Sequence, residues 1–544
     1  MDSDGQRGDE TVEPRGNAPG GTGREACYAG VDPDAPEPRS SGYRGFPPAK
    51  GRAAPGLDEH GRLRSGRLRG LTLNRAIWVL AWPIFIESLL NSMVGLTDTV
   101  LAAQLGADET DAIGGASYIN WFIGLTAMAI GVGSTAIVSR AVGRGRTAVA
   151  NAVVGQTILL QLVAGSIVAI LIILGSGYIA SALNMTEGAT AAFESYMSIV
   201  ALGVPMMGVM FGLIACARGA GDSLRPLLVM TVVNVVNIVV SFALVGTDLS
   251  RTRLVDGEPV SRVIVANPFG FDLGVQGIAI GTVAAHAVGA ILMLAIMIRG
   301  KTGVRLIRRR LRPHWHTIRR LVRQALPNYL ETFGLWFGNA FVLLLVGLIG
   351  SGALGSHIIA IRVEAFSFLP GFAMGTAAAT LVGQYLGAGS VALARTAVLR
   401  CAFIAAAFMG TLGVLFLLFP RAIVGTLSSQ EVHLENAPRL VMICGAVQIP
   451  FALAIVFRSA IRGAGDVRAA MVLTWTLTYA VRLPLVYALC GVAIPLGNGH
   501  SIANPFGFEP SLAALWLAMC IELVIRGAAY TVRFAQGAWA TKKV

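Results

Sequence analysis

Long apolar runs separated by short polar segments follow one another along most of the chain. Twelve of these runs are about 20 residues or more in length, which is what a helix needs to cross roughly 30 Å of hydrocarbon. The strands of a membrane barrel would be about ten residues long with alternating polarity, and these runs are neither, so we predict helices throughout. The predicted spans are 75–102, 114–139, 149–174, 190–215, 224–246, 274–298, 321–349, 355–386, 395–419, 436–460, 468–494 and 511–534.

The second half of this pattern repeats the first half at a constant shift of 244 positions. The Arg-Gly-Ala-Gly-Asp sequence at 218–222 recurs at 462–466, and other pairs share the shift: Pro83 with Pro327, Glu87 with Glu331, Gly106 with Gly350, Gly131 with Gly375 and Gly143 with Gly387. Such a repeat indicates a duplicated six-span unit. Because six is an even number, both copies have the same orientation. We therefore predict an all-α membrane protein with twelve transmembrane helices in two six-helix bundles, related by a pseudo-two-fold axis along the membrane normal.

Composition supports a chain dissolved in lipid. Hydrophobic residues make up 54% of the sequence and charged residues only 13%, against about 25% in soluble domains. The net charge of +13 could suggest a nucleic-acid partner, but most Lys and Arg lie in the N-terminal region and in loops, which is typical of a polytopic membrane protein. We therefore expect no nucleic acid. The six cysteines show no CxxC spacing and no His partners, so neither a zinc site nor a disulfide framework is expected, and no cofactor is implied.

The chain divides into four parts by composition and charge. Residues 1–70 are rich in Gly, Pro, Arg, Asp and Ser and lack apolar periodicity, so we predict a disordered cytoplasmic tail. A basic cytoplasmic linker at 299–320 separates the N-terminal bundle, 71–298, from the C-terminal bundle, 321–544. Arginines cluster before span one, after spans two and four, and in the linker. The positive-inside rule then predicts a multi-pass protein of the cell inner (plasma) membrane with both termini in the cytoplasm.

Span one carries three polar residues on one helical face. Glu87, Asn91 and Asp98 are spaced by four and seven residues, and such a stripe cannot face lipid without a large cost. We expect it to line the interior of the first bundle, although Glu87 could instead serve hydrogen bonding between helices. Asp98 has no acidic counterpart, because the repeat places Val342 at the equivalent position. A lone carboxylate is harder to explain as packing.

Spans five and six carry further polar side chains that could surround Asp98. These are Asn234, Asn237 and Ser241 on one face of span five, and Thr282 in span six. Together with Asp98 they could bind a proton or a small cation such as Na⁺, since a carboxylate withdrawn from water gains and loses a proton more easily near neutral pH. Ordinary bonding between helices also explains the Asn and Thr side chains, and His286, one turn after Thr282, fits a packed polar residue.

The second half offers a different set of polar residues. Glu331 and Asn339 share a face of span seven, and Arg362 and Glu364 lie in span eight. With Glu87 and Asn91 they are candidates for the substrate pathway, although the simplest expectation for Arg362 is a structural ion pair with a nearby carboxylate. We expect Arg458 and Arg526 to reach the cytoplasmic interface by extending along their helices. Arg482 has no explanation from sequence.

Two further motifs carry less chemistry. Glycines in the two Arg-Gly-Ala-Gly-Asp segments permit tight reversals and Asp can cap the next helix, so we interpret these segments as hinges and anchors. Gly300-Lys301-Thr302 resembles the end of a phosphate-binding loop, but Ala295 stands where the first Gly is required and no strand precedes it. Nucleotide binding is therefore unsupported, and any transport would be driven by an ion gradient.

Taken in order, these motifs resemble the multidrug and toxic compound extrusion (MATE) family, most closely its DinF-type branch, over about residues 73–535. The matching segments are Pro83, 96–99 (Leu-Thr-Asp-Thr), 218–222, 236–239 (Val-Asn-Ile-Val), 277–282 (Gly-Ile-Ala-Ile-Gly-Thr) and 361–387. The resemblance implies two bundles that export organic cations or amphiphiles in exchange for H⁺ or Na⁺.

The resemblance also implies a coupling site. In that branch an Asp in span one, an Asn and an Asp in span five and a Thr in span six form the site. Asp98, Asn237 and Thr282 match, whereas Ser241 stands where the second Asp is expected. Asp98 is then the only carboxylate of the group, which leaves H⁺ and Na⁺ both open. The span-seven Glu of another branch is not matched, because Leu335 takes its place.

Two other functions compete with antiport. A lipid-linked precursor flippase has similar bundles but usually a strongly cationic cavity, for which only Arg362 and Arg482 are available here. A membrane-embedded enzyme would need clustered catalytic groups, yet His286 and His357 lie in different halves. We therefore expect a transporter rather than an enzyme, acting as a monomer in the bilayer.

Overall fold

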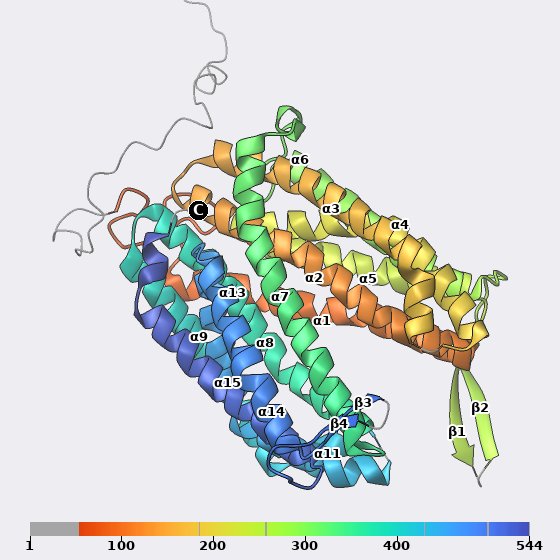
Figure 1. Ribbon diagram of the computed structural model, residues 1–544. Coiled ribbons are helices and arrows are strands. Elements are labelled where there is room, and N and C mark those ends of the chain that lie inside the picture. Colours follow the sequence, from red (N-terminus) through yellow and green to blue (C-terminus); the bar gives the residue numbers. More distant parts are fainter. Residues whose placement is uncertain (1–53, 184, 256–257, 429, 498–499, 543–544) are drawn as a thin grey trace, which may run out of the picture. The chain divides into compact units, whose positions relative to one another are not determined.

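The computed structural model describes residues 54–542 except positions 184, 256–257, 429 and 498–499, and most of this part is helical, as predicted (Figure 1). The helices of the first half are α1 (Leu73–Leu105), α2 (Ala107–Gly143), α3 (Thr147–Ala182), α4 (Glu187–Gly219), α5 (Leu224–Val245) and α6 (Gly274–Ile298). Those of the second half are α7 (Trp315–Ile349), α8 (Ala353–Ala388), α9 (Val391–Leu418), α11 (Glu431–Ala446), α12 (Gln448–Gly463), α13 (Val467–Trp475), α14 (Leu483–Cys490) and α15 (Leu512–Ala535).

Shorter elements lie between these helices or, in the case of η3, after the last one. They are the helical turns η1 (Arg308–Leu311), α10 (Pro420–Gly425) and η3 (Ala538–Thr541), the hairpin of β1 (Leu249–Val255) and β2 (Glu258–Val265) between α5 and α6, and the hairpin of β3 (Ile494–Gly497) and β4 (His500–Ile502) between α14 and α15. Within the described chain, eleven helical segments are long and apolar enough to cross a membrane, and α11 with α12 forms one further, bent span. The twelve predicted spans are thus accounted for.

The span predicted at 436–460 is not one straight helix. It is broken at Val447, where α11 and α12 meet at an angle of 58°. Proline explains the break, because Pro450 has no N–H to donate and its ring collides with the carbonyl four residues earlier, on Ala446. The chain therefore changes direction just before the proline.

The span predicted at 468–494 contains a wider turn. Between α13 and α14 lies η2 (Thr476–Arg482), a π-helical segment, and the helix ends at Cys490 rather than at 494. Pro484 lies two residues after the end of this segment and cannot bond to the carbonyl of Ala480, which favours the wider turn. π-Helical turns re-aim side chains, and Arg482 is the last residue of this one.

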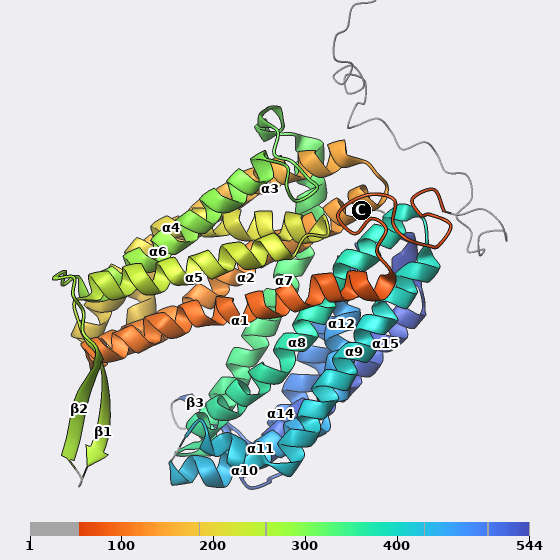
Figure 2. The ribbon, with the colours of Figure 1, turned by 180° about the vertical axis from the view of Figure 1, so that it is seen from behind.

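Two groups of packed helices, which we call the lobes, correspond to the two halves of the repeat. In the first lobe α4 packs on α2, α3 and α6, and α5 packs on α6 and α1. In the second, α12 packs on α8, α9 and α15, and α7 packs on α13. The lobes meet through α2 with α7 and α8, and through α1 with α8 (Figures 1 and 2). Small buried residues, mostly Ala, Gly and Val, fill the cores and let the helices approach closely.

The two Arg-Gly-Ala-Gly-Asp segments form equivalent tight turns after α4 and α12. Gly221 and Gly465 both have φ of 92°, a conformation that favours glycine. Asp222 accepts the backbone N–H of Arg225 at 3.3 Å, as expected for a residue capping the start of α5. The expected cap by Asp466 is absent, because its carboxylate pairs with Arg533 at 2.7 Å instead.

The lobes are in tight contact at the end of the helices that carries these turns and the 299–314 linker, which we call the linker end. A Cβ atom added to Gly143 of α2 would collide with the backbone of Gln384 in α8, and one added to Gly387 would collide with the backbone of Arg140. The side chain of Gln384 donates across the interface to the carbonyl of Gly219 at 2.9 Å. The linker end is therefore closed by direct backbone contact.

Residues 54–72, which we call the strap, cover this closed end. Leu57, Leu63 and Leu68 are each at most 4% exposed. The Gly56 N–H donates to Ala388 of α8 at 3.2 Å, and the Ser65 hydroxyl donates to the Val142 carbonyl of α2 at 2.6 Å. The strap thus contacts both lobes. The prediction of disorder is wrong for residues 54–70, because an average over composition conceals three well-spaced leucines. Residues 1–53 lie outside the described chain.

Anchoring by these leucines gives a first prediction. Replacing Leu63 with Ala removes a fully buried side chain, a change that costs about 2–5 kcal/mol in a protein core. Because the strap can detach without global unfolding, trypsin should cut at Arg62 and Arg64 about tenfold faster or more. Replacing the exposed Thr72 with Ala is the control. Equal cleavage rates in the two variants would show that Leu63 does not hold the strap in place.

Candidate functional site

Asp98 lies at the centre of a polar cluster inside the first lobe. Its side chain is buried, with 4% of the residue exposed. The Thr282 hydroxyl of α6 lies 3.1 and 3.0 Å from its two carboxylate oxygens, and the Asn237 amide of α5 donates to Oδ1 at 3.5 Å. The Tyr196 hydroxyl of α4 donates to Oδ2 at 2.9 Å. Four helices therefore converge on one carboxylate.

The neighbours of Asp98 also bond to one another. The Asn237 amide donates to the Thr282 hydroxyl at 3.0 Å and to the Ser241 hydroxyl at 3.4 Å. Ser241 packs so closely against Gly281 that a Cβ on that glycine would collide with it. The predicted residues Asp98, Asn237, Ser241 and Thr282 therefore lie in one cluster. Asn234 is buried beside it but donates to the backbone of Met230 at 2.9 Å.

Hydrogen-bond chemistry at the cluster is one-sided. Tyr196, Thr282 and Asn237 all act as donors toward Asp98, which suits an ionised carboxylate, because that group only accepts. The side-chain carbonyl oxygens of Asn237 and Asn234 are buried and have no hydrogen-bond partner. These are acceptors that a protonated carboxyl group or a cation could use. Across the described residues, no group of three or more His, Cys, Asp or Glu could hold a metal ion.

Tyr196 was missed by sequence reasoning. It is fully buried, and its hydroxyl lies between Asp98 and the Asn120 amide of α2, which donates to it at 3.4 Å. A lone Tyr within an apolar span is a usable clue, because a buried phenol requires a partner. His286 is buried one turn from Thr282, with Nδ1 2.8 Å from the Thr282 carbonyl, which fits a packed polar residue.

Glu87 does not belong to this cluster. Its carboxylate is buried and pairs with the Arg218 guanidinium of the Arg-Gly turn at 2.7 Å. Asn91 is exposed, so the predicted stripe along span one is not a continuous buried face. The repeat carries the same pairing into the second lobe, where Glu331 lies 3.7 Å from Arg462 and 3.4 Å from Arg458. The Glu87–Arg218 and Glu331–Arg462 pairs stand at equivalent positions.

A second charge network lies inside the second lobe. Glu522 of α15 is fully buried and accepts from Arg482 at 3.1 Å and from Arg526 at 2.6 Å. Arg482 also donates to Asn339 of α7 at 2.9 Å, and Arg526 to Thr478 at 3.0 Å. The π-helical turn aims Arg482 at Glu522, which explains a residue that sequence alone did not.

Three sequence expectations in the second lobe are wrong. Arg362 is exposed and makes no ion pair within the described residues. One candidate partner, Glu331, pairs with Arg458 and Arg462 instead. The other, Glu364, lies about 200° around α8 from Arg362. Arg526 does not extend to the interface but is buried against Glu522. Arg458 turns inward to Glu331.

Two homologous six-span lobes, with one buried carboxylate cluster in the first, are the construction of a secondary transporter. The MatE family model matches residues 83–243 and 327–488, one match in each lobe and together more than half of the chain. The chain therefore belongs to the MatE family. Members of this family are secondary transporters and not enzymes.

Curated relatives match most of the chain. The probable multidrug resistance protein NorM of Thermotoga maritima is 23% identical over 466 residues, which cover 86% of this chain and 93% of that protein. The multidrug resistance protein MdtK of Edwardsiella ictaluri is 24% identical, over 76% of this chain and 87% of that protein.

Solved structures share the fold. A MOP superfamily transporter from Pyrococcus furiosus has a TM-score of 0.74 at 17% identity and covers 86% of this chain and 97% of its own. The MATE transporter VcmN of Vibrio cholerae in its bent form has a TM-score of 0.73 at 19% identity, over 85% and 96%. At these identities the likeness establishes the two-lobed fold alone.

Proposed function

We propose that this protein is an antiporter that exports organic cations or amphiphilic compounds in exchange for H⁺ or Na⁺. The Asp98 cluster carries this proposal. The buried carboxylate of Asp98 on α1 is contacted by side chains of α4, α5 and α6, and the side-chain oxygens of two nearby asparagines have no hydrogen-bond partner. Relatives named multidrug resistance proteins support the substrate class. Asn339, Arg362 and Glu364 of the second lobe remain candidates for the pathway, while Glu87 and Glu331 hold helices through ion pairs.

Asp98 couples ion movement to substrate movement by changing between an ionised state and a state loaded with H⁺ or Na⁺. In the ionised state it accepts from Tyr196, Thr282 and Asn237. When it is protonated it becomes a donor and needs an acceptor, which the unpaired Asn237 carbonyl oxygen provides after a rotation of that amide. A bound Na⁺ would use the same oxygens. Loading and emptying therefore rearrange the contacts among α1, α4, α5 and α6, and this rearrangement drives the lobes between two orientations.

In the membrane, we propose that the linker end faces the cytoplasm, so that both termini lie inside the cell. The state with a closed linker end is then the one that is open to the outside. The distribution of arginines supports this orientation. A single chain supplies both lobes of the pathway, so the transporter acts as a monomer in the bilayer.

Transport by purified full-length protein in liposomes tests the proposal. Ethidium movement should follow an imposed H⁺ gradient or an imposed Na⁺ gradient, each applied separately. Asp98→Asn should abolish the response, with a loss of about tenfold or more, because an amide cannot be loaded and emptied. Asp111→Asn, which makes the same change at an exposed carboxylate, should transport normally. Gradient-driven transport by Asp98→Asn at the wild-type rate would refute the role of Asp98.

A further inference from the structure

At the linker end, α1 of the first lobe lies beside α9 of the second (Figure 2). A groove there is lined by one residue of α1 and five residues of α9. Its volume is about 450 Å³. Its lining combines one cation, two small polar side chains and three apolar ones: Arg400, Asn74, Thr396, Leu399, Phe403 and Ile404. The first lobe supplies only Asn74 to this groove, and none of the lining residues belongs to the Asp98 cluster.

Arg400 has no negatively charged partner there. Its Nη1 donates to the side-chain oxygen of Asn74 at 2.6 Å, and this partner is neutral. Over the part of the chain that the structure describes, no carboxylate lies within 4.0 Å of its guanidinium. The carboxylate of Asp58, in the strap at the same end, accepts the backbone N–H groups of His60 and Arg62. An arginine has several N–H donors, so most of its capacity remains unused.

The position of Arg400 along α9 makes this unusual. It is the tenth residue of the helix, about 14 Å from the helix start at 1.5 Å per residue. A helix of 28 residues is about 42 Å long, so a centred hydrocarbon layer of about 30 Å begins roughly 6 Å from its end. For a helix that runs along the membrane normal, this places the backbone of Arg400 about 8 Å inside the hydrocarbon layer. An unpaired charge at this depth is unfavourable.

The side chain of Arg400 is drawn back toward the headgroup level. Asn74 is the second residue of α1, so it lies at the headgroup end of that helix. Its hydrogen bond to Arg400 holds the guanidinium at this end. Below it, Leu399 and Phe403 expose 46% and 75% of their surface to the surroundings. Exposed Arg75 and Arg395 add positive charge nearby. The groove thus offers a cation at headgroup level and an apolar wall beneath it, which is the shape of a phospholipid.

We propose that this groove binds an acidic phospholipid, with the headgroup phosphate on Arg400 and Asn74 and an acyl chain along Leu399, Phe403 and Ile404. Guanidinium groups pair with phosphate through two parallel charge-assisted hydrogen bonds. Because Asn74 and Arg400 belong to different lobes, the bound lipid joins the lobes and stabilises the closed linker end.

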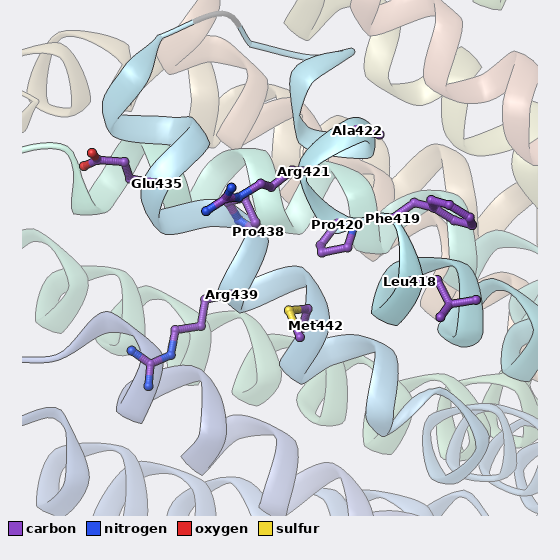
Figure 3. A pocket seen from close by; sticks show the side chains of 9 residues that line it. All are labelled: Leu418, Phe419, Pro420, Arg421, Ala422, Glu435, Pro438, Arg439 and Met442. Carbon is purple, nitrogen blue, oxygen red and sulfur yellow. The ribbon is translucent and has the colours of Figure 1, made fainter.

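A second groove at the other end of α9 is the natural comparison. It has about the same volume, 440 Å³, and includes Arg421 and Arg439, but the carboxylate of Glu435 shares the groove with them (Figure 3). Its lining residues all come from the second lobe, between Leu418 and Met442. The Glu435 carboxylate already supplies a negative charge in this second groove, and the groove lies within one lobe. Replacing Arg421 with Gln there is therefore a matched control for the replacement of Arg400.

Native mass spectrometry of the full-length protein tests the proposal. The probes are phosphatidylglycerol and phosphatidylcholine with identical acyl chains, and inorganic phosphate as a competitor. Arg400→Gln should weaken phosphatidylglycerol binding about tenfold or more, and Arg421→Gln should not. Asn74→Ala should weaken binding by less, since it removes only the neutral partner. Both comparisons remain available if one variant folds poorly.

Three results would overturn the proposal. One is equal retention of the two lipids by the parent protein, and another is unchanged phosphatidylglycerol binding in Arg400→Gln and Asn74→Ala. The third is displacement of the lipid by millimolar inorganic phosphate, because the site would then recognise a free anion. Preferential retention of phosphatidylglycerol that depends on Arg400 and resists free phosphate supports a lipid site.

Discussion

Glu522→Gln is expected to destabilise the second lobe by about 3–5 kcal/mol, the usual cost of removing one partner from a buried ion pair. Glu522 is fully buried and lies between two arginines, Arg482 and Arg526, whose side chains are 12% and 6% exposed. Glutamine offers one acceptor oxygen where the carboxylate offers two, and its NH₂ group would face a guanidinium. The two arginines would then lose the carboxylate that they share.

The half-life at a fixed elevated temperature in detergent is the suitable measurement, because large membrane proteins rarely unfold reversibly. The half-life should fall strongly in Glu522→Gln and remain unchanged in Glu435→Gln, which makes the same change at an exposed position. Adding Arg526→Met to Glu522→Gln should recover part of the loss, since it removes one of the unpaired charges. A Glu522→Gln protein as long-lived as the parent would mean that the network contributes little to stability.

The architecture was predictable because lipid leaves the chain few choices. Each apolar run had to become a helix to satisfy its backbone, so run length alone located the spans. The constant shift of 244 positions then divided them into two lobes. The breaks inside spans were less accessible. Pro450 coincides with a break and Pro484 with a π-helical turn, whereas Pro83 and Pro327 lie inside continuous helices. A proline therefore indicates strain, but packing decides how that strain is relieved.

The candidate site was predictable where polarity was rare. Asp98, Asn237 and Thr282 are conspicuous in apolar spans, and the structure brings them into one cluster. Tyr196 was missed because an aromatic ring looks apolar until its hydroxyl has a partner. In the second lobe polar residues are numerous, and the ion pair predicted for Arg362 does not form within the described residues, because Arg362 is exposed. The true pairs, Arg482 with Glu522 and Arg458 with Glu331, join residues 40 and 127 positions apart.

Gly143→Ala is expected to reduce transport by about 5- to 150-fold while leaving the fold intact. Gly143 ends α2 at the linker end, and a Cβ atom there would meet the backbone carbon atoms of Gln384 in α8 at 2.8 Å and its carbonyl oxygen closer still. Backbone atoms cannot rotate away as a side chain can, so the two helices must separate. Overpacking of this kind costs about 1–3 kcal/mol. Only the state with a closed linker end bears that cost.

A cost of about 1.4 kcal/mol changes a population ratio tenfold, so the closed state should become about 5- to 150-fold less populated relative to the open one. Alternating access needs both states, and transport should fall with the population of the closed state. Gly143→Val extends the side chain further and should have at least as large an effect. Thermal stability should change little, because each lobe keeps its own core.

Spin labels at exposed Arg146 and Arg395, one in each lobe near the linker end, report the separation directly. Cys27 is replaced by Ser, and the five cysteines of the described chain are buried. The label distance should lengthen in Gly143→Ala and stay unchanged in Gly114→Ala, on the same helix, where an added Cβ meets no atom within 4 Å. Alanine also favours the helix over glycine, so Gly114→Ala should be at least as stable as the parent. If Gly143→Ala kept both the parental distance and parental transport, close contact between α2 and α8 would not be needed for the transport cycle.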